Sequence, residues 1–241
     1  MFKQIEQKKN LIDQKRPLPP NTLKSIRESI LLDWTYNSNA IEGNTLTLSE
    51  TKVVLEGITI GGKTLNEHLE AINHKEAILY LEDIIKLQET FSEWQIKNIH
   101  RLILKGIDDD NAGVYRKENV LISGAKHTPP HYVSVPAQME ELINWYYEEG
   151  PKLHVMERSS LLHIEFVKIH PFVDGNGRTA RLLLNLELMK NGYPPSIIKK
   201  EERIDYYNAL DKAHTRNEFD DFFQLIAKSL NRSLDLYLKL I

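Results

Sequence analysis

Apolar residues recur with a helical period along most of the chain, and short polar or turn-forming segments separate the periods. A spacing of three and four residues places the apolar side chains on one face of each segment, as a core-facing helix requires. The pattern therefore predicts an all-α protein. The expected helices are residues 5–15, 23–37, 48–57, 66–87, 92–106, 137–148, 153–169, 177–190, 201–214 and 219–240.

Local sequence signals mark several of the expected helix ends. Thr47 is followed three residues later by Glu50, and Ser92 by Gln95. Both pairs match the capping box, in which two side chains satisfy free backbone N–H groups at a helix start. The run Pro17–Pro20 is expected to form a stiff extended linker, because proline fixes the backbone and cannot continue a helix.

Residues 113–135 differ from the helical pattern. Val120–Ile122 and Tyr132–Val135 are rich in residues that favour strands, and Ser123–Pro130 between them is rich in turn formers. Two short strands alone are only marginally stable. We therefore expect a small β-hairpin that projects from the helical body as a mobile flap.

Composition narrows the classes of partner. The chain has 241 residues, of which 41% are hydrophobic, which is enough for one large domain or two small ones. Its 31 basic and 34 acidic residues give a net charge of -3, so nothing attracts the whole molecule to nucleic acid or to an anionic membrane. No cysteine is present, which removes disulfides and thiolate metal sites. The first residues are too polar for a signal peptide, and no run approaches the ~20 apolar residues of a membrane span. A soluble cytoplasmic protein is expected.

The segment His170–Arg181 combines the groups that a phosphate site requires. Gly175-Asn176-Gly177 gives the backbone unusual freedom, so that successive N–H groups can form an anion nest. The helix expected to begin there adds its first-turn N–H groups and its dipole. Arg178 and Arg181 are three residues apart, share a helix face, and can each hold phosphate through two hydrogen bonds.

Two further side chains of this segment add chemistry. Asp174 would repel phosphate unless a divalent cation joined them, and Mg²⁺ commonly binds one or two carboxylates together with substrate oxygens. His170 has a side chain suited to accepting a proton at neutral pH. Each part alone has an ordinary explanation as a helix cap, a turn or a solvated face. Their combination within twelve residues predicts phosphoryl or nucleotidyl transfer.

The same segment resembles the signature of the Fic family, His-x-Phe-x-Asp/Glu-Gly-Asn-Gly-Arg-x-x-Arg, and fills every fixed position. The resemblance implies the Fic fold, a helical bundle with a small hairpin flap. It also implies transfer of AMP from ATP to a Ser, Thr or Tyr hydroxyl of a target protein. His170 would deprotonate that hydroxyl, and Asp174 would hold Mg²⁺. Asn176 and the glycine backbone would hold the phosphates, with Arg178 and Arg181 on the β and γ groups, and pyrophosphate would leave.

The resemblance extends on both sides of the signature. Residues 113–135 resemble the family flap, which aligns the target segment by strand pairing and borders the nucleotide. Tyr206 and Tyr207 resemble the adenine side, where Tyr207 would offer an aromatic face and His214 an edge; core packing is the alternative for both tyrosines. The residues expected to bind ATP are Ser123, Gly124, Ala125, Lys126, Asp174, Gly175, Asn176, Gly177, Arg178, Thr179, Ala180, Arg181, Tyr206, Tyr207 and His214.

Ser38–Asn44 resembles the inhibitory motif of the family, Ser/Thr-x-x-x-Glu-Gly/Asn. Its position implies the subgroup whose inhibitory helix, about residues 23–43, precedes the catalytic core. The implied contact joins Glu42 to Arg181, the arginine that should hold the γ-phosphate. The alternative is a polar helix end capped by Gly43. In some relatives the same glutamate aligns a water that removes AMP, so Glu42 is also a candidate base for the reverse reaction.

We expect residues 1–95 to form an N-terminal helical region that includes the inhibitory helix, and residues 96–241 to form the catalytic core, packed together as one globular unit. Two other functions stay open at this point. One is a nucleotide-binding regulatory module with vestigial activity, and the other is transfer of phosphate, phosphocholine or UMP. A homodimer is a further candidate, because relatives often form dimers, and the sequence does not specify the target protein.

Overall fold

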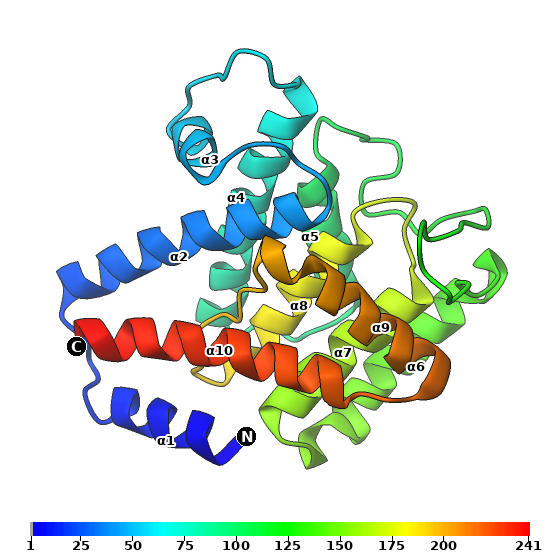
Figure 1. Ribbon diagram of the computed structural model, residues 1–241. Helices are drawn as coiled ribbons and strands as arrows, with labels where there is room; N and C mark the ends of the chain where they lie inside the picture. The colour runs from blue at the N-terminus through cyan, green and yellow to red at the C-terminus, as the bar shows by residue number, and fades with distance from the viewer. Residues whose placement is uncertain (1) are drawn as a thin grey trace.

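The computed structural model describes residues 2–241, and within that range it has ten α-helices, three short 3-10 helices and no strand. The all-α class is confirmed (Figure 1). The helices are α1 (Phe2–Asp13), α2 (Pro20–Ile41), α3 (Leu48–Leu55), α4 (Leu65–Lys86), α5 (Glu93–Leu104), η1 (Tyr132–Ser134), α6 (Val135–Glu148), η2 (Gly150–Lys152), α7 (Val155–Ile169), α8 (Asn176–Lys190), η3 (Lys200–Glu202), α9 (Arg203–Arg216) and α10 (Asp220–Leu240).

Helix α8 is the centre of the fold. Leucines at positions 182, 183, 184, 186 and 188 are all buried, although they point to different sides of the helix. A helix that is apolar all round has to be enclosed by other elements, and α4, α5 and α7 pack against it. The loop between α7 and α8 is consequently held at both ends by core helices. One buried cluster includes residues from α1 and α2 as well as from α7 to α10. The expected division into an N-terminal region and a catalytic core near residue 95 stays a prediction.

The first and last helices lie side by side (Figure 1). Lys8 Nζ lies 2.5 Å from an Asp235 carboxylate oxygen, and Lys15 Nζ donates to the Ile241 carbonyl at 2.9 Å. These contacts hold α1 against α10. No helix of residues 2–241 has the length and apolar composition that crossing a bilayer needs.

Helix α2 begins earlier and ends later than the sequence pattern predicts. It starts at Pro20 instead of residue 23, because proline is well tolerated in the first helical turn. It continues past residue 37 to Ile41 because its polar end is buried and has tertiary partners. The Asn37 side chain accepts a hydrogen bond from the Lys200 N–H at 3.0 Å, and that of Asn39 donates to the Glu70 carbonyl at 3.2 Å.

The capping signals are partly confirmed. Thr47 and Glu50 form the expected capping box at the start of α3. Ser92 caps α5 by accepting from the Trp94 N–H, but Gln95 does not complete a box there. A capping box that we did not predict joins Thr64 to Glu67 and opens α4.

We expected a β-hairpin in residues 113–135, but no strand forms there, so the expectation was wrong in this detail. Tyr132–Ser134 forms the short helix η1, and α6 follows at once. The buried guanidinium of Arg116 holds the segment instead. It donates to the carbonyls of His170 and Glu118, each at 2.9 Å, and to that of Pro130. These bonds tie the segment to the α7–α8 loop without cross-strand pairing.

Candidate functional site

The loop between α7 and α8 is fixed by its own backbone contacts. His170 ends α7 in a left-handed conformation, with φ 50° and ψ 60°, and its N–H donates to the Phe166 carbonyl at 3.0 Å. Phe172 is fully buried. The Asn176 amide closes the loop, since it accepts from the Phe172 N–H at 3.0 Å and donates to the Phe172 carbonyl at 2.9 Å. The Asn176 side chain therefore braces the loop.

Helix α8 begins with an uncapped first turn. Its N-cap, Gly175, has φ +74°, a value that glycine adopts without strain, and it offers no side chain to the free N–H groups. A Cβ at Gly175 would lie 3.2 Å from His100 Nε2, so a larger residue would also crowd the loop. Free N–H groups at a helix start bind anions. The local geometry therefore fits a phosphate site.

His100 supports this loop from α5, and sequence reasoning did not identify it. Its Nε2 lies 2.8 Å from the Asp174 carbonyl, and its Nδ1 accepts from the Gly113 N–H at 2.8 Å. The ring stacks on Phe172 with a centroid separation of 3.6 Å. Burial lowers the pKa of His100 to about 4, which keeps the ring neutral and its Nδ1 free to accept. Only the fold brings residue 100 to this loop.

His170 presents a neutral imidazole. Burial lowers its pKa to about 4, so that the ring is unprotonated at neutral pH. A backbone hydrogen bond with Val167 favours the protonated ring, but burial outweighs it. A neutral ring is the form that can accept a proton.

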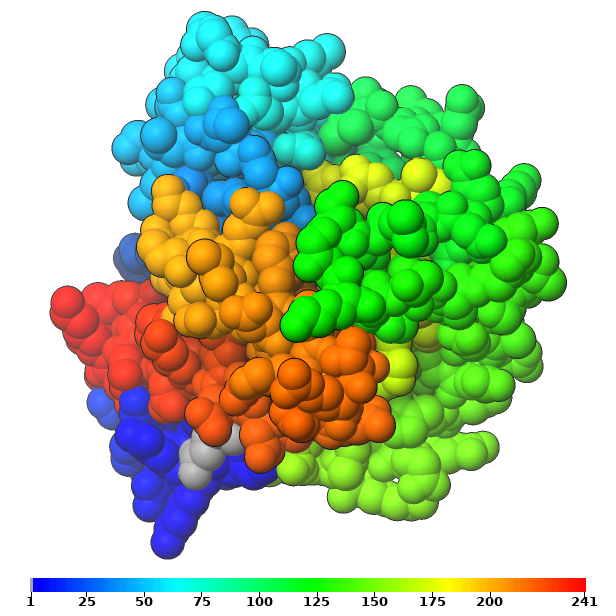
Figure 2. Space-filling model, turned by 45° about the vertical axis from the view of Figure 1, so that its right-hand side comes forward, coloured from blue at the N-terminus to red at the C-terminus, as the bar shows by residue number. Residues whose placement is uncertain are grey.

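His170 and the α8 N-terminus face one hollow of about 520 Å³, bordered by the flap, the α7–α8 loop and α9. Figure 2 shows flap residues lying beside α9 on the surface. Of the residues singled out in the sequence, the hollow is lined by Glu42, Ser123, Gly124, Ala125, His170, Asp174, Gly175, Asn176, Gly177, Tyr206, Tyr207 and His214. The others, Lys126, Arg178, Thr179, Ala180 and Arg181, are not part of this lining.

The two arginines of α8 are buried, and other residues of the protein accept their hydrogen bonds. Arg178 donates to Glu70 at 2.9 Å and to Asp174 at 3.1 Å. Arg181 donates to the Ser38 hydroxyl at 3.1 Å, the Ser38 carbonyl at 2.8 Å and the Tyr206 hydroxyl at 3.3 Å.

Glu42 occupies the cationic end of the site. Its carboxylate accepts from Arg181 Nη2 at 2.7 Å and lies so close to Gly177 that a Cβ there would collide with it. Burial alone would lower the pKa of Arg181, but the Glu42 carboxylate outweighs burial and raises it above its ordinary value. The negative group thus lies at the positive end of α8, where the helix dipole also favours it.

Helix α9 closes the other side of the hollow. Tyr206 is buried, and its hydroxyl contacts Arg181 and His163. Tyr207 is 39% exposed, and its hydroxyl donates to the Ile41 carbonyl at 3.3 Å. His214 Nε2 lies 3.0 Å from the Ile164 carbonyl, and burial lowers its pKa to about 4. Of the two tyrosines, Tyr207 therefore has the more accessible ring.

Arg203 also lines the hollow, and the sequence analysis did not single it out. Its guanidinium lies 5.5 Å from the centroid of the Tyr207 ring. The spacing of four residues between them on one helix was a usable signal.

The Asp174 carboxylate is open to a cation. Its side chain is 67% exposed, and within residues 2–241 its carboxylate bonds only to Arg178. The described residues contain no group of three His, Asp or Glu side chains close enough to hold a metal alone. A single accessible carboxylate beside a phosphate site fits Mg²⁺, which takes its other ligands from substrate and water.

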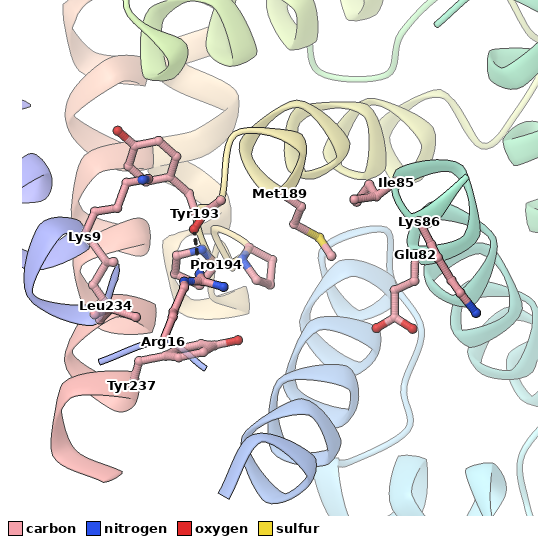
Figure 3. A pocket seen from close by; sticks show the side chains of 13 residues that line it. Lys9, Arg16, Glu82, Ile85, Lys86, Met189, Tyr193, Pro194, Leu234 and Tyr237 are labelled. Carbon is pink, nitrogen blue, oxygen red and sulfur yellow. Dashed lines mark hydrogen bonds between the residues drawn. The ribbon is translucent and has the colours of Figure 1, made fainter. Parts of the chain in front are cut away.

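A second hollow, of about 280 Å³, lies between α1, α4, α8 and α10 and shares no lining residue with the first (Figure 3). Its lining includes apolar side chains, among them Met189 and Leu234, and the charged side chains of Lys9, Arg16, Glu82 and Lys86. Arg16 donates to the Gly192 carbonyl at 3.2 Å, and Lys9 Nζ lies 5.2 Å from the Tyr193 ring centroid. These contacts join the N-terminal segment to the end of α8.

The fold and the site define a helical protein in which an uncapped helix start and a histidine face the same hollow. The profile of the Fic/DOC family matches residues 90–188. The protein adenylyltransferase Fic of Nematostella vectensis is 38% identical over 98% of this chain and 57% of that protein. The corresponding protein of Drosophila virilis is 36% identical over 90% of this chain and 45% of its own length.

Solved structures agree with these sequence relationships. A Fic-domain-containing signalling protein from Bacteroides thetaiotaomicron has a TM-score of 0.87 and 32% identity, covering 99% of this chain and 95% of that chain. Fic-1 from C. elegans has a TM-score of 0.86 and 34% identity, covering 99% of this chain and 72% of that chain. The chain belongs to the Fic/DOC family. It spans about half the length of the curated relatives that it matches.

Proposed function

We propose that the chain is a protein adenylyltransferase, which transfers AMP from ATP to a hydroxyl group of a target protein. The observation that carries the proposal is that a neutral His170 imidazole and the uncapped first turn of α8 face the same hollow. Both N. vectensis and D. virilis relatives are named for this activity, which supports it.

In this proposal the phosphates of ATP lie at the start of α8, where free N–H groups and the helix dipole stabilise negative charge. His170 accepts the proton of the target hydroxyl as its oxygen attacks the α-phosphorus. The bond from the α-phosphorus to the bridging oxygen breaks, and pyrophosphate leaves. The adenine base is expected against Tyr207, which offers an accessible aromatic face on the hollow.

Mg²⁺ is the proposed metal, and Asp174 is the residue that would hold it. When bound, the ion would neutralise phosphate charge and orient the leaving group. The exposure of the Asp174 carboxylate supports this assignment.

Glu42 is proposed to inhibit the enzyme. Its carboxylate lies against Gly177 and Arg181, at the end of α8 where the phosphates are expected, so the carboxylate and the nucleotide compete for the same positive groups. ATP is then kept from the pose that in-line attack requires. A partly buried pair of this kind can change a rate by roughly ten- to a thousandfold, because each ~1.4 kcal/mol corresponds to a factor of ten.

Mass spectrometry of modified proteins tests the proposal. Cell lysate is incubated with Mg²⁺ and the Glu42→Gly variant, in parallel reactions with ATP, UTP or CDP-choline as the donor, and the adduct is identified on modified peptides. We expect AMP on serine, threonine or tyrosine. A phosphate, phosphocholine or UMP adduct, or no adduct with any nucleotide, would reject adenylyl transfer in favour of the other functions.

A further inference from the structure

The Asp174 carboxylate is held in place by one side chain. Arg178 Nη2 donates to it at 3.1 Å, four residues further along the chain. The Asp174 side chain is otherwise exposed and would be free to rotate. The position of Arg178 therefore determines where the carboxylate lies.

Arg178 is itself held from another helix. Its side chain is 3% exposed, so solvent cannot satisfy the guanidinium. Arg178 Nη1 donates to Glu70 Oε1, on α4, at 2.9 Å, and its Nε has no partner in the part of the chain that is described. Glu70 and Asp174 thus compensate one buried positive charge between them, and removal of either would leave the guanidinium with a single carboxylate.

Glu70 is oriented by the segment that follows α2. Its second oxygen, Oε2, accepts from the Asn44 amide at 2.8 Å, and the same amide donates to the Glu67 carbonyl at 3.0 Å. Both carboxylate oxygens of Glu70 are therefore engaged, one toward Asn44 and one toward Arg178. A continuous set of hydrogen bonds connects the residue two positions after Glu42 to the exposed carboxylate at the phosphate site.

We propose that Glu70 is a positioning residue for the metal ligand of this site: through Arg178, it fixes the Asp174 carboxylate in the orientation that receives Mg²⁺ with the nucleotide. The proposal rests on the proposed function. It also assigns Arg178 a different role from the phosphate contact that the family signature implies. Residues that hold a metal ligand in place typically change metal affinity or activity by about 10- to 100-fold when they are replaced.

The test is a nucleotide-binding titration in the Glu42→Gly background, in which the inhibitory carboxylate is absent. A fluorescent ATP analogue is titrated with increasing Mg²⁺ and, separately, in EDTA. We expect Glu70→Ala to raise the Mg²⁺ concentration for half-maximal binding by about tenfold or more, with binding in EDTA unchanged. Glu70→Gln should give a smaller shift, because its amide oxygen can accept from Arg178 while its nitrogen cannot accept from Asn44.

The matched control is Glu76→Ala. Glu76 is on the same helix and in an ion pair, 3.0 Å from Lys105 Nζ, but that pair is exposed and outside the site. Thermal melting of each variant separates a loss of folding from a loss of the Mg²⁺ effect, and Glu70→Gln keeps the test valid if Glu70→Ala does not fold. The proposal is overturned if the Glu70 variants show the same Mg²⁺ dependence as Glu76→Ala, or if Mg²⁺ has no effect in any variant. Mg²⁺-dependent binding without AMP transfer would reject the proposed function alone, and the titration would still decide the role of Glu70.

Discussion

The Glu42 carboxylate accepts a hydrogen bond from Arg181 at 2.7 Å and lies against Gly177 in the first turn of α8. Glu42 directly follows α2, so the contact places the end of one helix against the start of another. The negative end of the first helix and the positive end of the second favour this arrangement. In the proposed enzyme, the protein's own carboxylate stands where a phosphate group would otherwise bind.

Replacement of Glu42 by glycine should increase AMP transfer by at least about tenfold, because it leaves Arg181 and the α8 N–H groups available to the nucleotide. Glu42→Gln should give a smaller increase, since it keeps a hydrogen-bond acceptor but removes the charge. The initial rate of AMP incorporation measures both. Glu28→Gln, an exposed position on α2, is the control and should behave as wild type; equal rates for all variants would exclude an inhibitory role of Glu42.

His170→Asn should lower the rate of transfer by about 100- to 10,000-fold, the usual contribution of a general base. Asparagine is the suitable replacement because residue 170 has φ 50°, a conformation that asparagine tolerates better than alanine does. Affinity for the ATP analogue should change little, since the phosphate site is built from α8. Near-normal turnover with normal binding would contradict the assignment of His170 as the base.

Ser38→Ala should reduce the free energy of unfolding by about 1.5–3 kcal/mol, because the Ser38 hydroxyl accepts from the buried, charged Arg181 at 3.1 Å. Urea denaturation measures this change. Ser25→Ala, on the same helix, removes a hydroxyl that donates to the Asn21 carbonyl in an exposed position, and it should cost less than about 0.5 kcal/mol. Similar losses for both variants would show that the Ser38 contact with Arg181 adds nothing.

Tyr207→Ala should weaken binding of the ATP analogue by roughly tenfold, and Tyr207→Phe should leave it nearly unchanged. Stacking of a base on an aromatic side chain contributes about 1–3 kcal/mol and depends on the ring, not on the hydroxyl. Equilibrium fluorescence titration in the Glu42→Gly background measures both. An equal loss in Tyr207→Phe would instead point to the hydroxyl, which contacts the Ile41 carbonyl.

Stability should fall as the pH drops from about 6.5 toward 4. Burial lowers the folded-state pKa of five histidines, of which three have values near 4. An unfolded histidine has a pKa near 6.5, so in this window the unfolded chain binds more protons, and each such histidine contributes a slope of about 1.4 kcal/mol per pH unit. They are His74, His100, His163, His170 and His214.

Urea unfolding at pH 7, 6 and 5 checks this pH dependence. Burial would raise the pKa of Glu202, but hydrogen bonds from Arg232 and Lys228 lower it to about 2. Carboxylates of this kind lose their contribution to stability only below their unfolded pKa near 4.5. The range from pH 7 to 5 therefore isolates the histidines. His163→Gln should reduce the slope of the unfolding free energy against pH by about 1.4 kcal/mol per pH unit, which corresponds to one proton. Equal stability of the wild type at pH 7 and 5 would contradict the lowered histidine pKa values.

The sequence was most informative where a local rule determines structure. The α7–α8 loop could be predicted because proline stops a helix and glycine permits a left-handed turn within a few residues, and the capping box at Thr47 is likewise local. The family resemblance also pointed to the contact between Glu42 and Arg181, which lie far apart in the chain.

Contacts between distant residues without a motif could not be predicted. Nothing near Glu70 indicates that it meets Arg178, and nothing near His100 indicates that its ring stacks on Phe172. The flap was misjudged for a related reason: its residues favour strands, but no strand forms, and the buried Arg116 instead holds the segment through the carbonyls of Glu118, Pro130 and His170. The cytoplasmic compartment, the homodimer and the removal of AMP stay predictions.

The most direct test of adenylyl transfer compares two labels on ATP. The Glu42→Gly variant and the double variant Glu42→Gly/His170→Asn are each incubated with lysate and Mg²⁺, using ATP labelled at the α- or at the γ-phosphorus. We predict that, above the label taken up by lysate without the enzyme, protein acquires the α-label and not the γ-label, and only with an intact His170. Incorporation of the γ-label above that background, or α-labelling that persists without His170, would contradict the account.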